Sequence, residues 1–282
     1  MNKLLPVLLL LFVAACTNSG GGSDKPDDSV ITTQSTGIPA PQNITYNIIG
    51  VYPHDTSAYT QGLQFHDGKL YEGTGEYEKS SLRITEIKTG NVLQKHMMGS
   101  SIDAGGVFGE GITIFKDKIY QLTWQSNIVY VYDLKNINAP IKTFKWPYEG
   151  WGITNNGTDL IISDGTSNIY FVNPEDFSVK TTRQVVDNQG PVIRLNELEY
   201  INGYVYANVY TADYIVKIDP NNGHVVGRMS MQGLIQQYAP NYSLDLNEKG
   251  EVLNGIAYDS TTQKVYITGK DWPKMFEMTI NP

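Results

Sequence analysis

Only one of the 282 residues is a cysteine, Cys16, and it lies close to the start of the chain. If Cys16 is modified at the N-terminus, no other thiol remains for a disulfide, a thiolate nucleophile or a zinc–cysteine site. A chain without disulfides must be stabilised by its core, and a chain of this length is large enough to bury one.

The sequence also lacks the patterns of several common functions. It has no block of basic residues and a net charge of −8, which argues against nucleic acid as a partner. Its histidines lack metal-ligand spacing, which argues against a zinc hydrolase, and we expect them on the surface or in hairpins: His54, His66, His96 and His224. There is no Gly-x-Ser-x-Gly motif and no glycine-rich phosphate loop, so an esterase elbow and a nucleotide site are unsupported.

The first residues have the pattern of an export signal. A short basic start precedes an apolar run at 4–13, which is too short to stay in a bilayer as a spanning helix. Val13-Ala14-Ala15-Cys16 resembles a bacterial lipobox, in which the cysteine is lipidated and becomes the mature N-terminus. We predict a lipoprotein signal peptide at 1–15, lipidation of Cys16, and a lipid anchor in the cell envelope, facing the periplasm or in the outer membrane. An ordinary signal with a chance cysteine is the alternative.

Residues 16–43 are predicted to form a disordered tether between this anchor and a folded domain at 44–282. The tether is rich in Gly, Ser, Thr, Asp and Pro. Such a composition cannot bury enough surface to offset the entropy of ordering the chain. Acidic runs at 24–28 and 245–251 can be interpreted as calcium sites, although such runs are more often solvated loops. We expect no required cofactor and no catalytic metal.

An imperfect repeat runs through the folded domain. A polar turn followed by a short apolar strand occurs five times, at 67–71, 116–120, 156–161, 202–206 and 262–266. A second turn follows each of the first four copies, at 87–90, 133–135, 172–175 and 218–221. A period in the forties with several short strands per copy is typical of a β-propeller. We therefore predict an all-β fold with five blades; a sandwich or an irregular barrel is the alternative.

The last copy lacks the second turn and runs to the C-terminus through 274–280. The N-terminal run at 44–52 can supply the missing strand, so that both ends of the domain meet in one blade. Closure of the ring by this N-terminal strand removes an exposed sheet edge.

Each copy follows a segment with a polar or aromatic residue, a small residue and an apolar residue, as expected of the innermost strand of a blade. A five-fold ring of these segments brings five side chains toward one axis: Gln61, Glu110, Trp151, Asn196 and Asn254. Glu110 lies between Gly109 and Gly111, and burial there raises the pKa of a carboxyl toward a range suited to proton transfer. Side chains that only plug the channel, or a turn glutamate between two permissive glycines, are the alternatives.

Nine segments in order resemble the plant and bacterial glutaminyl-peptide cyclotransferases. One is Phe108-Gly109-Glu110-Gly111-Ile112-Thr113, and another is Leu253-Asn254-Gly255-Ile256-Ala257-Tyr258. The others lie at 59–63, 80–83, 120–124, 149–152, 163–165, 194–200 and 268–273. The match covers about residues 46–276, nearly all of the expected domain.

The resemblance implies a five-bladed propeller that cyclises an N-terminal glutamine to pyroglutamate and releases ammonia without a metal. Its partners are then peptides or proteins with N-terminal Gln, and we expect a monomer. The resemblance makes Glu110 the proton shuttle, with Lys270 stabilising the oxyanion and Asn196 orienting the carboxamide. It places substrate contacts at Gln61, Phe108, Trp124, Trp151 and Tyr210.

The chain departs from the family pattern in two places. Tyr210 stands where the family often has a tryptophan, which predicts a changed substrate fit. The segment at 231–250 is longer than its counterparts and is expected to form a lid or an insertion.

Two other functions stay open at this point. A non-catalytic propeller lipoprotein would scaffold envelope proteins. A lactonase-like propeller would hold calcium at the axis, with Glu110, Asn196 and Asn254 as candidate ligands.

Overall fold

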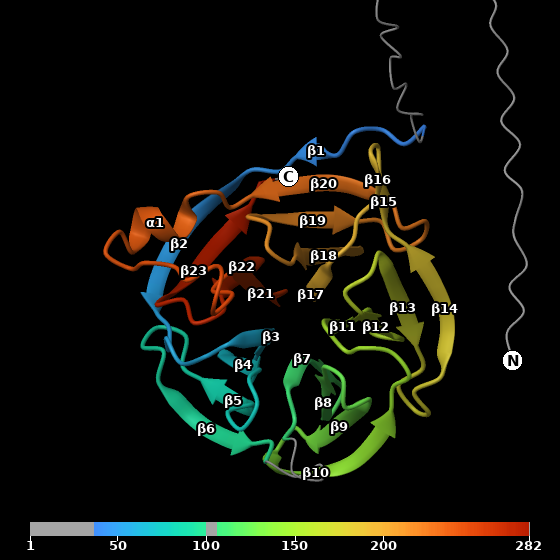
Figure 1. Cartoon of the computed structure of the whole chain (residues 1–282), viewed down its shortest axis with the longest axis vertical. Helices are drawn as coiled ribbons and strands as arrows, with labels where there is room; N and C mark the ends of the chain where they lie inside the picture. Colours follow the sequence, from blue (N-terminus) through green and yellow to red (C-terminus); the bar gives the residue numbers. More distant parts are fainter. Residues whose placement is uncertain (1–36, 100–105, 282) are drawn as a thin grey trace, which may run out of the picture. The chain divides into compact units, whose positions relative to one another are not determined.

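Five sheets stand around a common axis and form the blades of a five-bladed β-propeller (Figure 1). The computed structural model describes residues 37–99 and 106–281. Within these residues the regular structure consists of 23 strands and one short helix. The all-β fold and the number of blades confirm what the repeat predicts.

In each blade four antiparallel strands follow one another outward from the axis, and in blades 1 to 4 these strands are consecutive in the chain (Figure 1). Blade 1 consists of β3 (Thr60–His66), β4 (Lys69–Thr74), β5 (Ser81–Thr85) and β6 (Val92–Met97). Blade 2 consists of β7 (Gly109–Phe115), β8 (Lys118–Thr123), β9 (Ile128–Asp133) and β10 (Asn136–Lys145). Blade 3 consists of β11 (Ile153–Asn155), β12 (Leu160–Ser163), β13 (Asn168–Val172) and β14 (Val179–Gln184).

The other two blades come from the C-terminal part of the chain and from one N-terminal strand. Blade 4 consists of β17 (Leu195–Ile201), β18 (Tyr204–Val209), β19 (Tyr214–Ile218) and β20 (Val225–Ser230). Blade 5 consists of β21 (Leu253–Asp259), β22 (Lys264–Gly269), β23 (Lys274–Ile280) and β2 (Tyr46–Pro53). A small hairpin of β15 (Val186–Asp187) and β16 (Gly190–Pro191) lies between β14 and β17 in the chain.

Tight turns join the first and second strands of the blades where the repeat predicts them. In two of these turns the backbone is left-handed, with φ of 47° at Asp67, 75° at Gly68, 49° at Asn202 and 88° at Gly203. Two consecutive positive φ angles are the geometry of the tight hairpin turn that Asn-Gly and Asp-Gly favour. The four outer turns also lie at the predicted positions, between the third and fourth strands of blades 1 to 4.

Blade 5 joins the two ends of the described chain. β2 pairs antiparallel with β23 and is the outermost strand of its sheet. The strand partner expected for the C-terminal run is therefore present, and closure of the ring through this pairing stays a prediction. β1 (Gln42–Asn43), from the end of the expected tether, pairs in parallel with β20 of blade 4.

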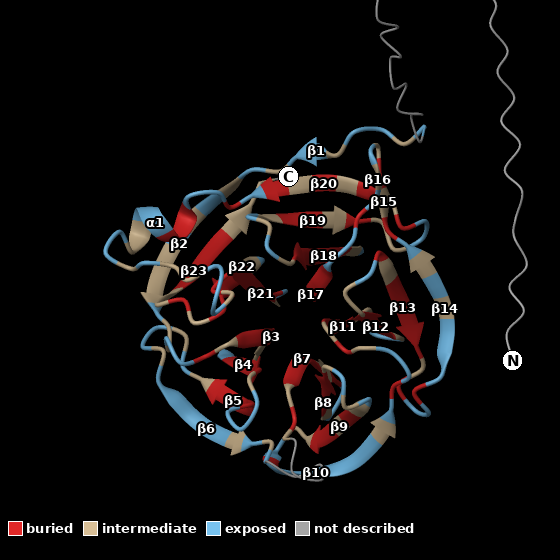
Figure 2. Cartoon of the chain, viewed as in Figure 1, coloured by how far each residue is buried: buried red, intermediate tan, exposed pale blue. Residues whose placement is uncertain are grey.

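Apolar side chains fill the interfaces between neighbouring blades. Among the described residues they form five clusters, one for each pair of neighbouring blades. Between blades 3 and 4, for example, Ile161 and Ile169 belong to the same cluster as Leu198 and Val205. Such burial contributes roughly 25 cal/mol per Å² of apolar surface. Figure 2 shows the result, with buried inner strands and exposed rim strands such as β6 and β14.

The long connection between blades 4 and 5 is an insertion that packs on blade 5. It contains α1 (Leu234–Tyr238), whose Leu234 lies in the apolar cluster with Trp272. The Tyr242 hydroxyl then donates to the carbonyl oxygen of Asp271 at 2.8 Å. Neither in 37–99 nor in 106–281 is any helix long and apolar enough to cross a membrane.

Candidate active site

Residues from all five blades line one cavity beside the axis. It has a volume of about 240 Å³ and lies where the first strands of the blades begin and the second strands end. Its walls contain the eight residues that the sequence analysis assigns to catalysis or substrate binding, and one residue that it does not assign. The lining residues are Tyr59, Gln61, Phe108, Glu110, Trp124, Trp151, Asn196, Tyr210 and Lys270.

A β-bulge occurs at the polar site residue in the inner strand of four blades. The ladder register shifts at Gln61 in β3, at Glu110 in β7, at Asn196 in β17 and at Asn254 in β21. A bulge leaves one residue outside the ladder and re-aims its side chain. In blade 3 the site residue, Trp151, lies just before β11 begins, and its amide donates to the Ser163 carbonyl oxygen at 3.1 Å. The bulges therefore explain how strands that bury the blade interfaces also direct polar side chains to one cavity.

The glycines of the inner strands allow the blades to approach each other. A Cβ atom on Gly111 would lie 2.7 Å from the carbonyl oxygen of Trp151, and one on Gly152 would lie 2.0 Å from that of Asn196. The amide of Gly111 donates to the Trp151 carbonyl at 2.8 Å across this contact. Gly111 is thus required by the packing of blade 2 on blade 3, and the setting of Glu110 follows from that packing.

Glu110 is the buried carboxyl of the cavity, with 4% of its surface exposed. Burial raises the pKa of Glu110 well above its ordinary value; the Lys270 charge opposes this, and the Glu149 charge adds to it. Gln61 Nε2 donates to Glu110 Oε1 at 2.9 Å, and Gln61 Oε1 accepts from Asn254 Nδ2 at 3.2 Å. Asn254, expected around the axis, therefore lies behind Gln61 and orients it rather than lining the cavity.

Lys270 is the buried cation of the cavity, with 3% of its surface exposed. Its ammonium lies 4.5 Å from the ring centre of Tyr59 and 4.8 Å from that of Tyr210, so two aromatic faces replace part of its hydration. Burial lowers the pKa of Lys270 to about 8, although Glu110 and Asp271 both favour the charged form. Among the described residues it has no ion-pair partner within 4.0 Å.

Aromatic side chains form the remaining walls. Phe108 packs edge-on against Tyr59 and Trp124, with ring centres 6.1 and 5.6 Å apart, and Trp151 packs edge-on against Tyr210 at 5.7 Å. These walls are apolar and rigid, so a bound polar group meets only a few oriented partners.

Asn196 is a buried amide in the cavity wall. Its Oδ1 atom has no hydrogen-bond partner among the described residues. An unpaired buried acceptor is costly, so a donor on a bound molecule would gain more here than at a hydrated surface.

Sequence reasoning missed two residues of the site. Tyr59 lies within the quoted segment 59–63 but received no role, and its ring faces Lys270. Glu149 lies within the quoted segment 149–152 and accepts hydrogen bonds from Trp124 and Trp151. Both residues lie in segments that resemble the family, and this was the sequence signal that could have found them. Their roles follow from contacts with residues of other blades, Lys270 for Tyr59 and Trp124 for Glu149.

The prediction that all histidines are surface or hairpin residues is wrong for His54. Its side chain is 7% exposed and lies 2.9 Å from Glu72 Oε1 through Nε2 and 2.7 Å from the Trp272 carbonyl oxygen through Nδ1. No group of three or more His, Cys, Asp or Glu side chains with metal-binding geometry occurs in the described part of the chain. Cys16 and the acidic run at 24–28 lie outside the described residues. In the run at 245–251, Glu251 instead accepts from the Asp245 amide at 2.8 Å.

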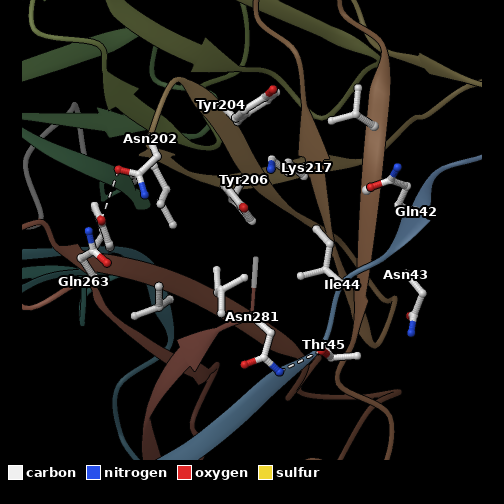
Figure 3. Close-up of a pocket in the computed structure, with 16 residues that line it drawn as sticks. Gln42, Asn43, Ile44, Thr45, Asn202, Tyr204, Tyr206, Lys217, Gln263 and Asn281 are labelled. Carbon is white, nitrogen blue, oxygen red and sulfur yellow. Dashed lines mark hydrogen bonds between the residues drawn. The ribbon is translucent and has the colours of Figure 1, made fainter.

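A larger cavity of about 630 Å³ lies elsewhere, between blades 4 and 5 (Figure 3). It contains none of the residues assigned to the candidate active site. Its one charged lining residue, Lys217, has its ammonium 4.0 Å from the ring centre of Tyr204. The cavity beside the axis is smaller, but it alone among the described cavities combines a buried carboxyl with a buried ammonium.

A propeller with a buried acid–base pair in an aromatic-walled axial cavity has the features of an enzyme that moves protons on a small polar group. The chain belongs to the glutamine cyclotransferase family, whose family model matches residues 26–280. It is 38% identical over 237 residues to a glutaminyl-peptide cyclotransferase of Arabidopsis thaliana, a match that covers 83% of this chain and 70% of the relative. The crystal structure of the Myxococcus xanthus glutaminyl cyclase superimposes with a TM-score of 0.77 at 32% identity, covering 86% of this chain and 98% of the other.

Proposed function

We propose that this protein cyclises N-terminal glutaminyl residues of peptides and proteins to pyroglutamate and releases ammonia. The observation that carries the proposal is that a buried carboxyl, Glu110, and a buried ammonium, Lys270, line the same axial cavity. The family membership supports the same reaction.

Glu110 performs both proton transfers of the proposed reaction. The free α-amine of the substrate attacks the carbon of its own side-chain carboxamide, and a new C–N bond forms. Glu110 accepts the proton that the amine loses and donates it to the amide nitrogen, which leaves as ammonia when its C–N bond breaks. A carboxyl with a raised pKa suits both steps, because proton transfer is most effective when the pKa lies near the working pH.

Lys270 and Asn196 act on the carboxamide itself. The tetrahedral intermediate carries negative charge on the former amide oxygen, and the Lys270 ammonium stabilises this charge where little water competes. The unpaired Oδ1 of Asn196 accepts an N–H of the carboxamide and sets its orientation. Gln61 is bonded to Glu110, so we propose that it fixes the carboxylate as well as contacting the peptide terminus.

The size and walls of the cavity suit a single terminal residue. Its volume of about 240 Å³ is slightly below the range of roughly 300–1,000 Å³ typical of pockets for drug-sized ligands. Phe108, Trp124, Trp151 and Tyr210 enclose the flat carboxamide and exclude water. The Tyr210 hydroxyl makes this wall less apolar than a tryptophan would.

The remaining sequence predictions extend the proposal to the cellular setting. The chain is exported, lipidated at Cys16 and held at the envelope, where it acts as a monomer on exported peptides and requires no metal. The apolar run at 4–13 and the lipobox-like Val13-Ala14-Ala15-Cys16 support the anchor. The absence of a histidine cluster from the sequence supports metal independence.

The deciding experiment is ammonia release from a Gln-initiated dipeptide by the full chain, with and without a chelator. Turnover should survive chelation and should fall roughly 10²- to 10⁴-fold in Glu110→Gln, because that variant cannot accept the proton. Glu248→Gln, at an exposed position of the connection to blade 5, is the matched control and should retain wild-type turnover. No release from a folded wild-type protein would favour the non-catalytic scaffold, and loss on chelation would favour a metal at the axis.

A further inference from the structure

Three of the four tryptophans donate a hydrogen bond to Glu149. Its Oε2 atom accepts from Trp124 Nε1 at 2.8 Å and from Trp151 Nε1 at 2.9 Å. Its Oε1 atom accepts from Gln125 Nε2 at 2.9 Å, and its backbone oxygen accepts from Trp146 Nε1 at 3.1 Å. One carboxylate thus joins a tryptophan of blade 2 to a tryptophan of blade 3.

We propose that Glu149 is a positioning residue, which holds the two tryptophan walls of the cavity in place and adds a fixed negative charge near Glu110. This inference rests on the proposed function, because it assigns Glu149 a part in binding and converting the glutaminyl terminus.

The geometry explains why one carboxylate does this better than separate partners. An indole N–H can only donate, so each of these partly buried tryptophans needs an acceptor in the cavity wall. When Trp124 and Trp151 share one oxygen atom, the edges of both rings are fixed relative to each other across the boundary between blades 2 and 3. Hydrogen bonds to a charged acceptor are also stronger than those to a neutral one. The cavity wall is therefore rigid before the substrate arrives, and binding does not have to order it.

The charge of Glu149 persists over the pH range in which Glu110 titrates. Partial burial raises the pKa of Glu149, but the hydrogen bonds from Gln125, Trp151 and Trp124 more than offset this, and its pKa lies below the ordinary value. Glu149 therefore stays ionised while the pKa of Glu110, raised by burial, is raised further by this neighbouring charge. Glu149 thus influences both the shape of the site and the protonation of its base.

Glu149→Gln is the informative variant. Glutamine keeps the size but carries no charge and only one acceptor oxygen, so the bonds from Trp124 and Trp151 either lose their acceptor or become weaker bonds to a neutral oxygen. We expect KM to rise roughly tenfold, the change that corresponds to one lost hydrogen bond to a charged group, with a smaller change in kcat. We also expect the acid limb of kcat/KM to move to lower pH, because loss of the Glu149 charge lowers the pKa of Glu110.

A double-mutant cycle separates positioning from general stabilisation. In a Trp124→Phe, Trp151→Phe background the indole N–H donors are gone, so adding Glu149→Gln should raise KM by less than about twofold. The acid limb should still move, because the charge effect does not pass through the tryptophans. Glu248→Gln, the exposed control, should change neither quantity.

Three results would overturn the inference. The first is a folded Glu149→Gln protein with wild-type KM and an unmoved acid limb, and the second is a KM effect of full size in the double-phenylalanine background. If Glu149→Gln does not fold, the single variants Trp124→Phe and Trp151→Phe are measured instead. An unchanged KM in both of them is the third result that would overturn the inference. Wild-type turnover separates the two proposals. If the folded wild-type protein does not convert the dipeptide, the proposed function and this inference both fail. If it does, the variants test the role of Glu149 alone.

Discussion

At the scale of single residues, the cavity brings together two groups whose surroundings favour their neutral forms. Glu110 and Lys270 are both buried, and burial raises the pKa of the acid and lowers that of the base. Their mutual attraction opposes this effect on each of them. The site therefore holds a carboxyl whose raised pKa suits proton transfer and an ammonium that is charged below about pH 8, the two groups that the proposed cyclisation uses.

The alkaline limb of kcat/KM should report Lys270, because this ratio follows the protonation of the free enzyme. Its ammonium is present below a pKa of about 8 and is lost as the pH rises through that value, so kcat/KM should fall above about pH 8. Lys270→Arg stays charged throughout this range, so this alkaline limb should disappear, although misfit between the rings of Tyr59 and Tyr210 should lower kcat/KM roughly tenfold. The measurement is a pH profile of kcat/KM for both proteins.

Lys249→Arg provides the control, because this side chain is 65% exposed and should leave the profile unchanged. Titration of the substrate amine affects every variant equally, so the comparison isolates Lys270. An alkaline limb that stays in place in Lys270→Arg would contradict the assignment.

Sequence alone identified most of these residues because each occupies a recurrent place in the repeat. Glu110 lies just before a repeat copy, and the family resemblance singled out Lys270. Tyr59 was missed because Lys270, whose ammonium faces its ring, lies far along the chain. Glu149 was missed because one of the two indoles that it binds, that of Trp124, comes from another blade, although Trp151 lies only two residues away. No local pattern distinguishes them from surface residues.

At the scale of strands, turn chemistry was predictable and the register of pairing was not. Gly68 and Gly203 mark hairpin turns because left-handed backbone favours glycine. The bulges at Gln61, Glu110 and Asn196 depend on how the partner strand aligns, which local sequence does not encode. The glycines beside them could be noticed in the sequence, but their purpose, the close approach of a neighbouring blade, required the structure.

Gly152→Ala should test the close approach of the blades. The added Cβ would lie 2.0 Å from the Asn196 carbonyl oxygen, so blades 3 and 4 must separate. We expect a loss of about 3 kcal/mol or more in the free energy of unfolding, at the upper end of overpacking effects. Activity should also fall, because Asn196 moves with its backbone. Urea denaturation and ammonia release measure the two effects.

Gly157→Ala is the comparison, since a Cβ there meets nothing within 4 Å and only the positive φ of 85° opposes it. It should cost roughly 1–2 kcal/mol and leave turnover unchanged. If Gly152→Ala were no more destabilising than Gly157→Ala, the packing argument would be wrong.

At the scale of the whole molecule, the first and last blades meet around β2 and the residues that follow it. β2 pairs with β23 in blade 5, and the chain then continues into blade 1 through His54. The two ring nitrogens of His54 lie at hydrogen-bond distance from the Trp272 carbonyl of blade 5 and from Glu72 of blade 1. Sequence reasoning placed His54 at the surface or in a hairpin because its two partners belong to different blades, one at the start of the domain and one near its end.

His54 should make the stability of the ring depend on pH. Both ring nitrogens face acceptors, which favours the charged form. Burial lowers the pKa of His54 and Arg83 also lowers it, but Glu72 and the Trp272 carbonyl more than offset both, so the pKa is raised above 6.5. The stabilisation is therefore complete below pH 6.5, the unfolded value, and is lost as the pH rises through the higher folded value.

The variant His54→Gln removes this charge and should lower the free energy of unfolding by about 3 kcal/mol below pH 6.5, the cost of breaking a buried ion pair. Because wild-type His54 becomes neutral as the pH rises, the difference between the two proteins should shrink above pH 6.5. Urea denaturation at several pH values measures this difference, with His224→Gln as the control because His224 lies in a hairpin turn away from the junction. A difference that grows with pH would mean that the neutral imidazole, and not the charged one, links blade 5 to blade 1.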